Sequence, residues 1–292
     1  MPLFELVHTP EFSNPPVLVQ HLEGWIDAGL GAATAVRTIL ESSETVTVAS
    51  FDSDILLDHR SHRPSMKLVD GVYEGVAWPG IELVAATDAD GREFLLLYGV
   101  EPDHNWRAFA AGIADLAMEL GVERVVGLGA YPAAVPHTRP PRISPTATSE
   151  QLANFPGFVR GSIEVPAGIQ AIIEIECGER GIPALGIWAQ VPHYVATMPY
   201  PPASVALMEA LFDVTGLRFE IAALRSEAES VRNRIDALIR ANPEHVAMVR
   251  RLEEAHDTFT TGGGDLPTGE EIAQELQRFL SEQSGDSGLA DE

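Results

Sequence analysis

The opening of the chain constrains the fold most, because it has the pattern of a buried strand, a glycine-rich turn, a helix and a second strand. Residues 17–22 are mostly apolar, as in a strand covered on both faces. A turn over 23–29 follows, residues 30–41 favour a helix, and residues 46–51 form the second strand. Consecutive β, α and β elements favour parallel strands with a right-handed crossover.

Later segments add hairpins and more helices. Short apolar runs between residues 65 and 98 are interrupted by turn dipeptides such as Asp70-Gly71, so hairpins are expected there. Helices are also predicted over 105–120 and 167–177, strands over 122–129 and 184–191, and a proline-rich loop over 131–145. We therefore predict an α/β fold with a mixed, largely parallel sheet flanked by helices.

The C-terminal part is predicted to be helical from residue 201. Apolar residues over 221–238 recur at spacings of three and four, which is a seam for packing against another helix. Asn242-Pro243 marks a break and restart, because Asn is a good N-cap and Pro fits the first helical position. We predict an α/β core over 1–219, a helical hairpin over 220–257, and an acidic linker, short helix and disordered tail over 258–292.

The charge and the cysteine count restrict the partners and the compartment. A net charge of -24 repels nucleic acid and anionic lipid, so we expect neither nucleic acid nor membrane as a partner. Cys177 is the only cysteine, which fits a reducing compartment. The sequence shows neither a signal peptide nor a run of about 18 apolar residues. The predicted location is the cytoplasm.

The turn after the first strand is the first candidate binding segment. Gly24, Gly29 and Gly31 allow a ligand to approach the backbone, and the helix N-terminus that follows suits an anion. Glu23 or Asp27 could hydrogen-bond a base or a sugar, although both would repel a phosphate. The alternative is that the glycines only allow the strand and the helix to pack closely.

Two further candidate segments follow later strands. Tyr131, His137, Arg139 and Arg142 lie in the proline-rich loop, where two arginines near a histidine could hold a carboxylate or a phosphate. His193 and Tyr194 follow the strand over 184–191, and the histidine could transfer a proton near neutral pH. The alternatives are a loop that contacts a neighbouring subunit and a packed histidine with satisfied hydrogen bonds. If the strands are parallel, all three segments open on one edge of the sheet.

No complete catalytic signature occurs in the sequence. It contains no nucleophile elbow, no P-loop and no paired-histidine zinc motif. Residues 58–62 include metal-type side chains, but they lack the regular spacing of a metal site. We therefore predict no catalytic residue, no metal and no cofactor, and the sequence leaves open whether the chain is an enzyme.

Several of these segments resemble the proteasome assembly chaperone family of the second type. Glu-Gly-Trp-Ile-Asp-Ala-Gly over residues 23–29 resembles the opening motif of that family. Pro-His-Tyr-Val-Ala over 192–196, Tyr-Pro-Pro-Ala over 200–203 and Leu-Glu-Glu over 252–254 are similar to its actinobacterial branch. The resemblance covers roughly residues 1–257 and implies a nucleoside phosphorylase-like fold. It also implies homo-oligomers, with a trimer as one possibility.

The resemblance further implies a role in protein assembly. Several family members dock on proteasome rings through a C-terminal tail with a hydrophobic residue, a tyrosine and any residue. Residues 288–292 read Gly-Leu-Ala-Asp-Glu, which does not have that pattern.

Two functional hypotheses remain. The first is a non-enzymatic, assembly chaperone-like or protein-interaction protein, which binds itself and a proteasome-related or other protein partner. The second is an enzyme or binder that acts on a nucleoside-like or phosphorylated small molecule at the carboxyl edge of the sheet.

Overall fold

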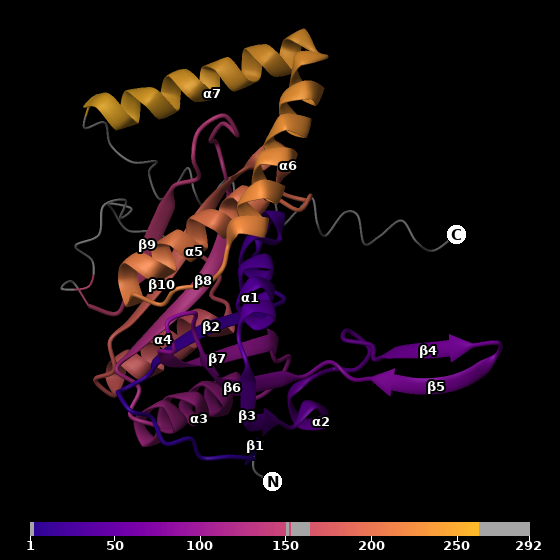
Figure 1. The fold of residues 1–292 in the computed structure, drawn as a ribbon, viewed down its shortest axis with the longest axis vertical. Helices are drawn as coiled ribbons and strands as arrows, with labels where there is room; N and C mark the ends of the chain where they lie inside the picture. The colour runs from indigo at the N-terminus through magenta and orange to yellow at the C-terminus, as the bar shows by residue number, and fades with distance from the viewer. Residues whose placement is uncertain (1–2, 150–151, 153–163, 263–292) are drawn as a thin grey trace. The chain divides into compact units, whose positions relative to one another are not determined.

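The computed structural model of the chain describes residues 3–149, 152 and 164–262 (Figure 1). Its contacts divide the chain into two compact units. The first unit comprises Met1–Trp25, Leu40–Gly127 and Ala167–Leu185, and the second comprises Ile26–Ile39, Leu128–Pro166 and Gly186–Glu292. The sequence predicted another division, into three consecutive domains, and that division stays a prediction.

The strands form a mixed sheet. Their bounds are β1 Phe4–Leu6, β2 Val17–Glu23, β3 Thr45–Phe51, β6 Ile81–Thr87, β7 Glu93–Val100, β8 Arg124–Ala133, β9 Ile143–Ala147 and β10 Ala184–Pro192. They pair in the order β1-β3-β6-β7-β2-β8-β10-β9. β2 is parallel to β7 and to β8, whereas β1 with β3, β3 with β6 and β6 with β7 are antiparallel. The mixed α/β fold with flanking helices is therefore confirmed.

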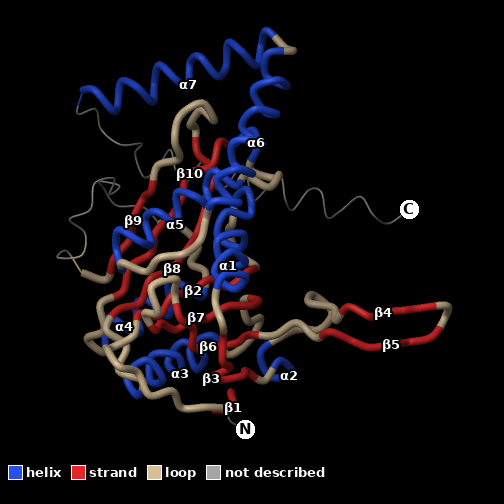
Figure 2. Tube along the Cα trace, in the orientation of Figure 1, coloured by secondary structure: helices blue, strands red, loops and turns tan. Residues whose placement is uncertain are grey.

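Most helices of the described ranges lie where the sequence predicted them (Figure 2). Their bounds are α1 Gly31–Ser42, α2 Ser53–Leu56, α3 Trp106–Glu119, α4 Ile169–Glu179, α5 Pro201–Thr215, α6 Ala222–Arg240 and α7 Pro243–Gly262, with short 3-10 helices at Ala28–Leu30 and His193–Val195. A short helix over 53–56 was not predicted, and residues 216–221 are not helical, although the chain was predicted to be helical from residue 201. The predicted break at Asn242-Pro243 separates α6 from α7. None of these helices is long and apolar enough to cross a membrane.

The core of the first unit lies between β2, its neighbouring strands and the helices α3 and α4. Every residue of β2 except the last is buried, as expected for a strand with a parallel neighbour on each side. α3 turns its predicted apolar stripe inward, so that Phe109, Ile113 and Leu116 are buried in the same cluster. The periodicity of the sequence thus determined which faces of these elements pack.

Two predicted boundaries differ from the structure. The proline-rich loop predicted over 131–145 is shorter, because β8 continues to Ala133 and β9 begins at Ile143. α7 continues through Gly262, past residue 258 where the sequence predicted a linker to begin. The last predicted helix, over 269–281, lies outside the described residues.

A β-hairpin forms a small sheet of its own, and we call it the arm. β4 (Ser65–Val69) and β5 (Val72–Ala77) pair antiparallel around the predicted turn at Asp70-Gly71. Figure 1 shows the arm as a separate two-stranded ribbon. Every residue of both strands is exposed, in contrast to the buried strands of the main sheet.

The first unit also buries a carboxyl group. Gln20 Nε2 donates to Gln170 O at 3.2 Å and to Glu174 Oε1 at 3.4 Å. The Glu174 carboxyl packs so closely against β8 that a Cβ at Gly127 would clash with it. Burial raises the pKa of Glu174 from 4.5 to about 8, and the hydrogen bonds from Gln170 and Gln20 oppose that shift only partly.

This burial makes the stability of the fold depend on pH. Folded Glu174 keeps its proton up to about pH 8, whereas the unfolded chain loses it near 4.5. Its contribution to stability is therefore complete at acid pH and is lost as the pH rises toward 8. Between pH 5 and pH 7.5, we expect the unfolding free energy of the wild type to fall by about 3 kcal/mol more than that of Glu174→Gln. Urea denaturation at both pH values measures this difference.

Glu179→Gln is the matched control, because it removes an exposed carboxylate from the same helix. It should keep the pH dependence of the wild type. If Glu174→Gln kept that dependence as well, Glu174 would not be the buried acid responsible.

Candidate functional site

Asp27 closes the N-terminus of α1 in the second unit. Its Oδ1 accepts a hydrogen bond from Ala32 N at 2.8 Å, and its Oδ2 accepts one from Ala33 N at 2.9 Å. These N–H groups belong to the first turn, where a helix offers no internal acceptor and its dipole favours negative charge. The position that the sequence predicted for an anion therefore holds a carboxylate of the chain itself.

Gly29 and Gly31 allow close backbone contacts. Gly29 has a φ of +64°, and a Cβ there would lie 2.6 Å from the Cβ of Tyr200. Its N–H donates to Ala196 O and its carbonyl accepts from Tyr200 N, both at 2.7 Å. A Cβ at Gly31 would lie 2.9 Å from that of Ala130. Both glycines join the turn to neighbouring segments.

Glu23 and Gly24 lie in the first unit, at the end of β2. The carbonyl of Glu23 accepts from Glu101 N at 2.6 Å, while its side chain is exposed. Glu101 Oε1 in turn accepts from Ile169 N at 2.6 Å, at the start of α4. Burial raises the pKa of Glu101, and this hydrogen bond opposes the shift. A carboxylate of the chain thus caps this helix as well.

Tyr131 belongs to a hydrogen-bonded group between β8, β9 and β10. Its Oη lies 2.8 Å from Ser144 Oγ. Gln190 Nε2 donates to both hydroxyl oxygens at 3.0 Å. Burial raises the pKa of Tyr131, so the phenol stays neutral. This group stabilises the pairing of three strands.

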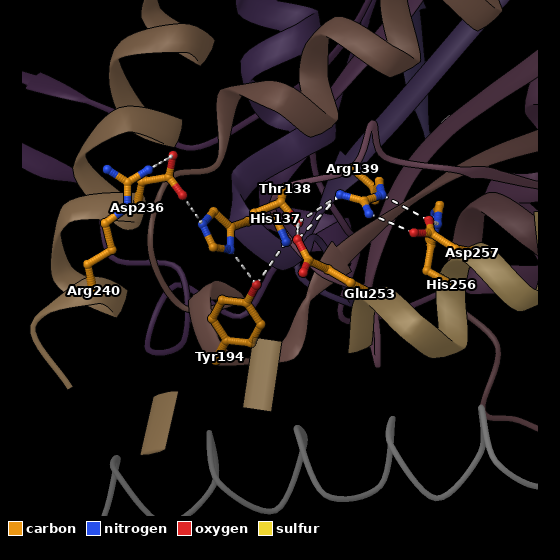
Figure 3. Close-up of polar contacts among 9 residues, drawn as sticks. All are labelled: His137, Thr138, Arg139, Tyr194, Asp236, Arg240, Glu253, His256 and Asp257. Atoms are coloured by element: carbon orange, nitrogen blue, oxygen red, sulfur yellow. Dashed lines mark hydrogen bonds and ion pairs between the residues drawn. The ribbon is translucent and has the colours of Figure 1, made fainter. Parts of the chain in front are cut away.

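His137 connects the β8–β9 loop to Tyr194 and to α6 (Figure 3). Its side chain is 0% exposed. Nδ1 lies 2.7 Å from Tyr194 Oη, which also accepts from the backbone N of His137 at 2.8 Å. Nε2 lies 3.2 Å from Asp236 Oδ1. The imidazole therefore bridges a phenol and a carboxylate.

This network determines which ring nitrogen carries the proton. Because Tyr194 Oη accepts the backbone N–H of His137, its own proton is available for Nδ1, and Nε2–H donates to Asp236. The imidazole is then neutral, in agreement with burial, which lowers the pKa of His137 against the opposing effect of Asp236. Burial also raises the pKa of Tyr194 to about 12. Such a series of hydrogen bonds could relay a proton, but both ring nitrogens already form hydrogen bonds within the protein.

The two loop arginines contact α7 (Figure 3). Arg139 donates from Nε and Nη2 to the two carboxylate oxygens of Asp257, at 2.9 and 2.6 Å. Its Nη1 reaches Glu253 Oε1 at 3.3 Å. Arg142 Nη2 donates to His256 O at 2.9 Å. The Arg139 guanidinium holds the pKa of Asp257 at about 2, so the pair is charged at neutral pH.

These contacts contribute much of what holds α7 in place. Among the α7 side chains that the structure describes, only Val249 is buried. Thr138 Oγ1 adds a hydrogen bond to Glu253 Oε1 at 2.5 Å. Val246, Met248 and Leu252 are only half-buried, so the acidic side chains supplement a small apolar contact.

The structure brings some of the predicted residues together. All except Glu23 and Gly24 lie in the second unit. The rings of His193 and Tyr194 are 5.4 Å apart, and Tyr194 contacts the arginine-bearing loop through His137. We expected all three segments to meet at one edge of the sheet and to bind a ligand there, and this stays a prediction.

The sequence analysis did not identify the acidic residues on α6 and α7. Asp236, Glu253 and Asp257 bind the predicted loop but lie about one hundred positions away in the sequence. One signal was available, because residues 253 and 257 are four apart and share a helix face. Their partners could not be identified from that spacing.

The chemistry of this region is that of internal pairing. In the described ranges, no group of three or more His, Cys, Asp or Glu side chains could hold a metal ion. Burial raises the pKa of the Cys177 thiol to about 12, which makes it a poor nucleophile. The carboxylates and the loop arginines bind each other or the backbone, an arrangement that fixes the loop and α7.

Comparisons with known proteins agree on one family. A model of the PAC2 family matches residues 21–239. A Mycobacterium tuberculosis protein of unknown function is 34% identical in sequence, with a TM-score of 0.85. The structural match covers 94% of this chain and 96% of the M. tuberculosis chain. A proteasome-assembly chaperone homologue of the same organism also shares 34% identity, covering 80% of this chain and 99% of its own at a TM-score of 0.74.

A more distant structure shows the same fold. The Pyrococcus furiosus archaeal proteasome activator shares 15% identity, with 80% of this chain and 97% of that chain covered and a TM-score of 0.61. No match was found among the curated proteins.

Asp27→Ala should destabilise the fold, because it removes the acceptor for two N–H groups at the start of α1. We expect a loss of about 1–2 kcal/mol in the unfolding free energy, measured by urea denaturation. Asp27→Asn keeps one acceptor oxygen and should cost less. Equal stability of the alanine variant and the wild type would show that Asp27 is not the cap.

Arg139→Gln should loosen α7 without unfolding α6, because α7 has little apolar burial to replace the lost contacts. Hydrogen exchange followed by mass spectrometry should show amides of α7 exchanging several-fold faster, with those of α6 unchanged. Arg251→Gln, at an exposed position of α7, is the control for the lost charge. Unchanged exchange in α7 would contradict this account of its attachment.

Proposed function

The chain belongs to the PAC2 family, and on that premise we propose that it is a non-enzymatic, assembly chaperone-like protein-interaction protein of the cytoplasm. It forms homo-oligomers, with a trimer as one possibility, and its further partner is a proteasome-related or other protein. Support comes from the M. tuberculosis relative described as a proteasome-assembly chaperone homologue, which is 34% identical. The structural observation that carries the proposal is an exposed apolar face on the arm.

The pairing of β4 with β5 places four apolar side chains on one face of the arm. Met66 pairs with Val76, and Leu68 pairs with Tyr73. Residues 66 and 68 share a face because side chains alternate along a strand. A register shift between Lys67 and Leu68 places an extra residue in β5, and this bulge keeps Tyr73 on the same side as Val76.

We call these four side chains the apolar face. Met66, Leu68, Tyr73 and Val76 are 54, 55, 72 and 51% exposed. A two-stranded hairpin is marginally stable by itself, and burial of one such side chain stabilises by about 1.5–3 kcal/mol. A contiguous exposed apolar surface of this kind is typical of a protein–protein contact. The arm is therefore suited to bind another protein chain.

The alternative function, an enzyme or binder for a nucleoside-like or phosphorylated small molecule, has less support. Asp27 occupies the N-terminus of α1, and Arg139 is bound by carboxylates of α7. A phosphate would have to displace a carboxylate of the chain at each of these positions.

Replacing part of the apolar face should dissociate the homo-oligomer. The double variant Met66→Ser and Tyr73→Ser removes two of its four side chains without touching the main sheet. We expect size-exclusion chromatography with light scattering to give the mass of one chain for this variant and a multiple of it for the wild type.

The matched control is the double variant Val69→Ser and Val72→Ser, which pair on the opposite face of the same arm. It should keep the mass of the wild type. Binding of purified proteasome particles is measured in parallel. A wild-type chain that stays monomeric and binds no proteasome particle would contradict the proposal.

A further inference from the structure

A small group of charged side chains attaches α7 to the β8–β9 loop (Figure 3). The loop contributes the guanidinium groups of Arg139 and Arg142, and α7 contributes the carboxylates of Glu253 and Asp257. Arg139 contacts both carboxylates, whereas Arg142 donates to a backbone carbonyl of α7. The contact therefore carries two positive and two negative charges at neutral pH.

His256 lies within this charged group. Its side chain is only 10% exposed, and its Nδ1 lies 3.5 Å from Asp257 Oδ1. The carbonyl that accepts from Arg142 Nη2, at 2.9 Å, is that of His256 itself. Its neighbour Asp257 binds Arg139. The imidazole is thus buried at the point where both arginines of the loop contact α7.

We propose that His256 makes the attachment of α7 sensitive to acid: a proton on its imidazole places a third positive charge beside Arg139 and Arg142 and releases α7 from the loop. A buried charge is costly unless an opposite charge compensates it. Asp257 compensates only in part, because both of its carboxylate oxygens already bind Arg139.

The direction of titration supports release at acid pH. Burial lowers the pKa of His256, Arg142 and Arg139 lower it further, and Asp257 opposes the shift only partly. Once α7 is released, the imidazole regains its ordinary pKa of 6.5. Neutral His256 therefore contributes fully to the attachment above about pH 6.5, and this contribution is lost as the pH falls below that value.

The other charged groups of the contact do not reverse this direction. Asp257 has a pKa of about 2, so it keeps its charge at pH 5.5. Burial lowers the pKa of His137 in the same loop, Arg232 adds to that shift, and Asp236 and Glu253 oppose it. A protonated His137 faces Asp236 at 3.2 Å, whereas a protonated His256 faces two guanidinium groups. His256 is therefore the more acid-sensitive of the two.

An acid-induced release of α7 is distinguishable from a general loss of stability. Glu174 in the first unit titrates with the opposite effect, because its contribution to stability is complete at acid pH. Loosening of α7 alone at acid pH is thus a local event.

Hydrogen exchange followed by mass spectrometry measures this release in the full-length chain, after correction for the intrinsic effect of pH on exchange. Between pH 7.5 and pH 5.5, we expect the protection of α7 amides to fall several-fold. The ordinary pKa of 6.5 limits the fall to about tenfold. The amides of α6 are the internal reference and should keep their protection.

Two variants separate the charge of His256 from its packing. His256→Gln takes up no proton, so the fall in α7 protection between the two pH values should disappear. His256→Lys is charged at both pH values, so α7 should already exchange faster at pH 7.5, with little further change at pH 5.5. A packing defect alone would lower protection equally at both pH values. His245→Gln, at an exposed position of the same helix, is the matched control and should respond to pH as the wild type does.

Equal protection of wild-type α7 at the two pH values would overturn the inference. A His256→Gln variant that kept the wild-type fall would also refute it, because the titrating group would then lie elsewhere. An equal loss of protection in α6 would point to general unfolding and would count against release of α7 alone.

Discussion

Carboxylates of the chain itself bind N–H and guanidinium groups that an external anion would otherwise take. Asp27 caps α1, Glu101 caps α4, and Asp257 binds Arg139 through two hydrogen bonds. Helix N-termini and paired arginines are where α/β proteins commonly hold phosphates or carboxylates. Because an internal carboxylate already satisfies these groups, an incoming anion gains only the difference between two similar interactions. The same pairing holds the β8–β9 loop and α7 in place.

Because these polar groups are paired within the chain, exposed apolar surface is the better candidate for binding a partner. Polar groups that are satisfied inside the chain contribute little to recognition, whereas exposed apolar side chains gain free energy when a partner covers them. In the described ranges, one cluster of such side chains lies on the arm, which forms no part of the main sheet, while others, such as Leu30, Met118 and Leu238, lie singly on other elements. An assembly role within the PAC2 family follows more readily from this distribution than a reaction on a small molecule.

The fold was predictable where short-range patterns specify it. The apolar run of β2, the stripe of Phe109 and Ile113 on α3, and the break at Asn242-Pro243 each depend on residues within a few positions of one another. The arm was predictable as a hairpin from its turn, but its apolar face was not. A one-residue bulge in β5 decides which side chains share a face, and no local sequence pattern indicated the position of that bulge.

The sequence by itself determined the α/β class, the main helices and strands and the glycine-rich turn, because periodicity, glycine and proline act on the local backbone. It also supplied the family motifs. Only the tertiary structure decided what the candidate residues contact. His137 meets Asp236 across 99 positions, and Arg139 meets Asp257 across 118. Such pairings depend on the path of the whole chain, so a local pattern can identify a charged side chain but not the group that neutralises it.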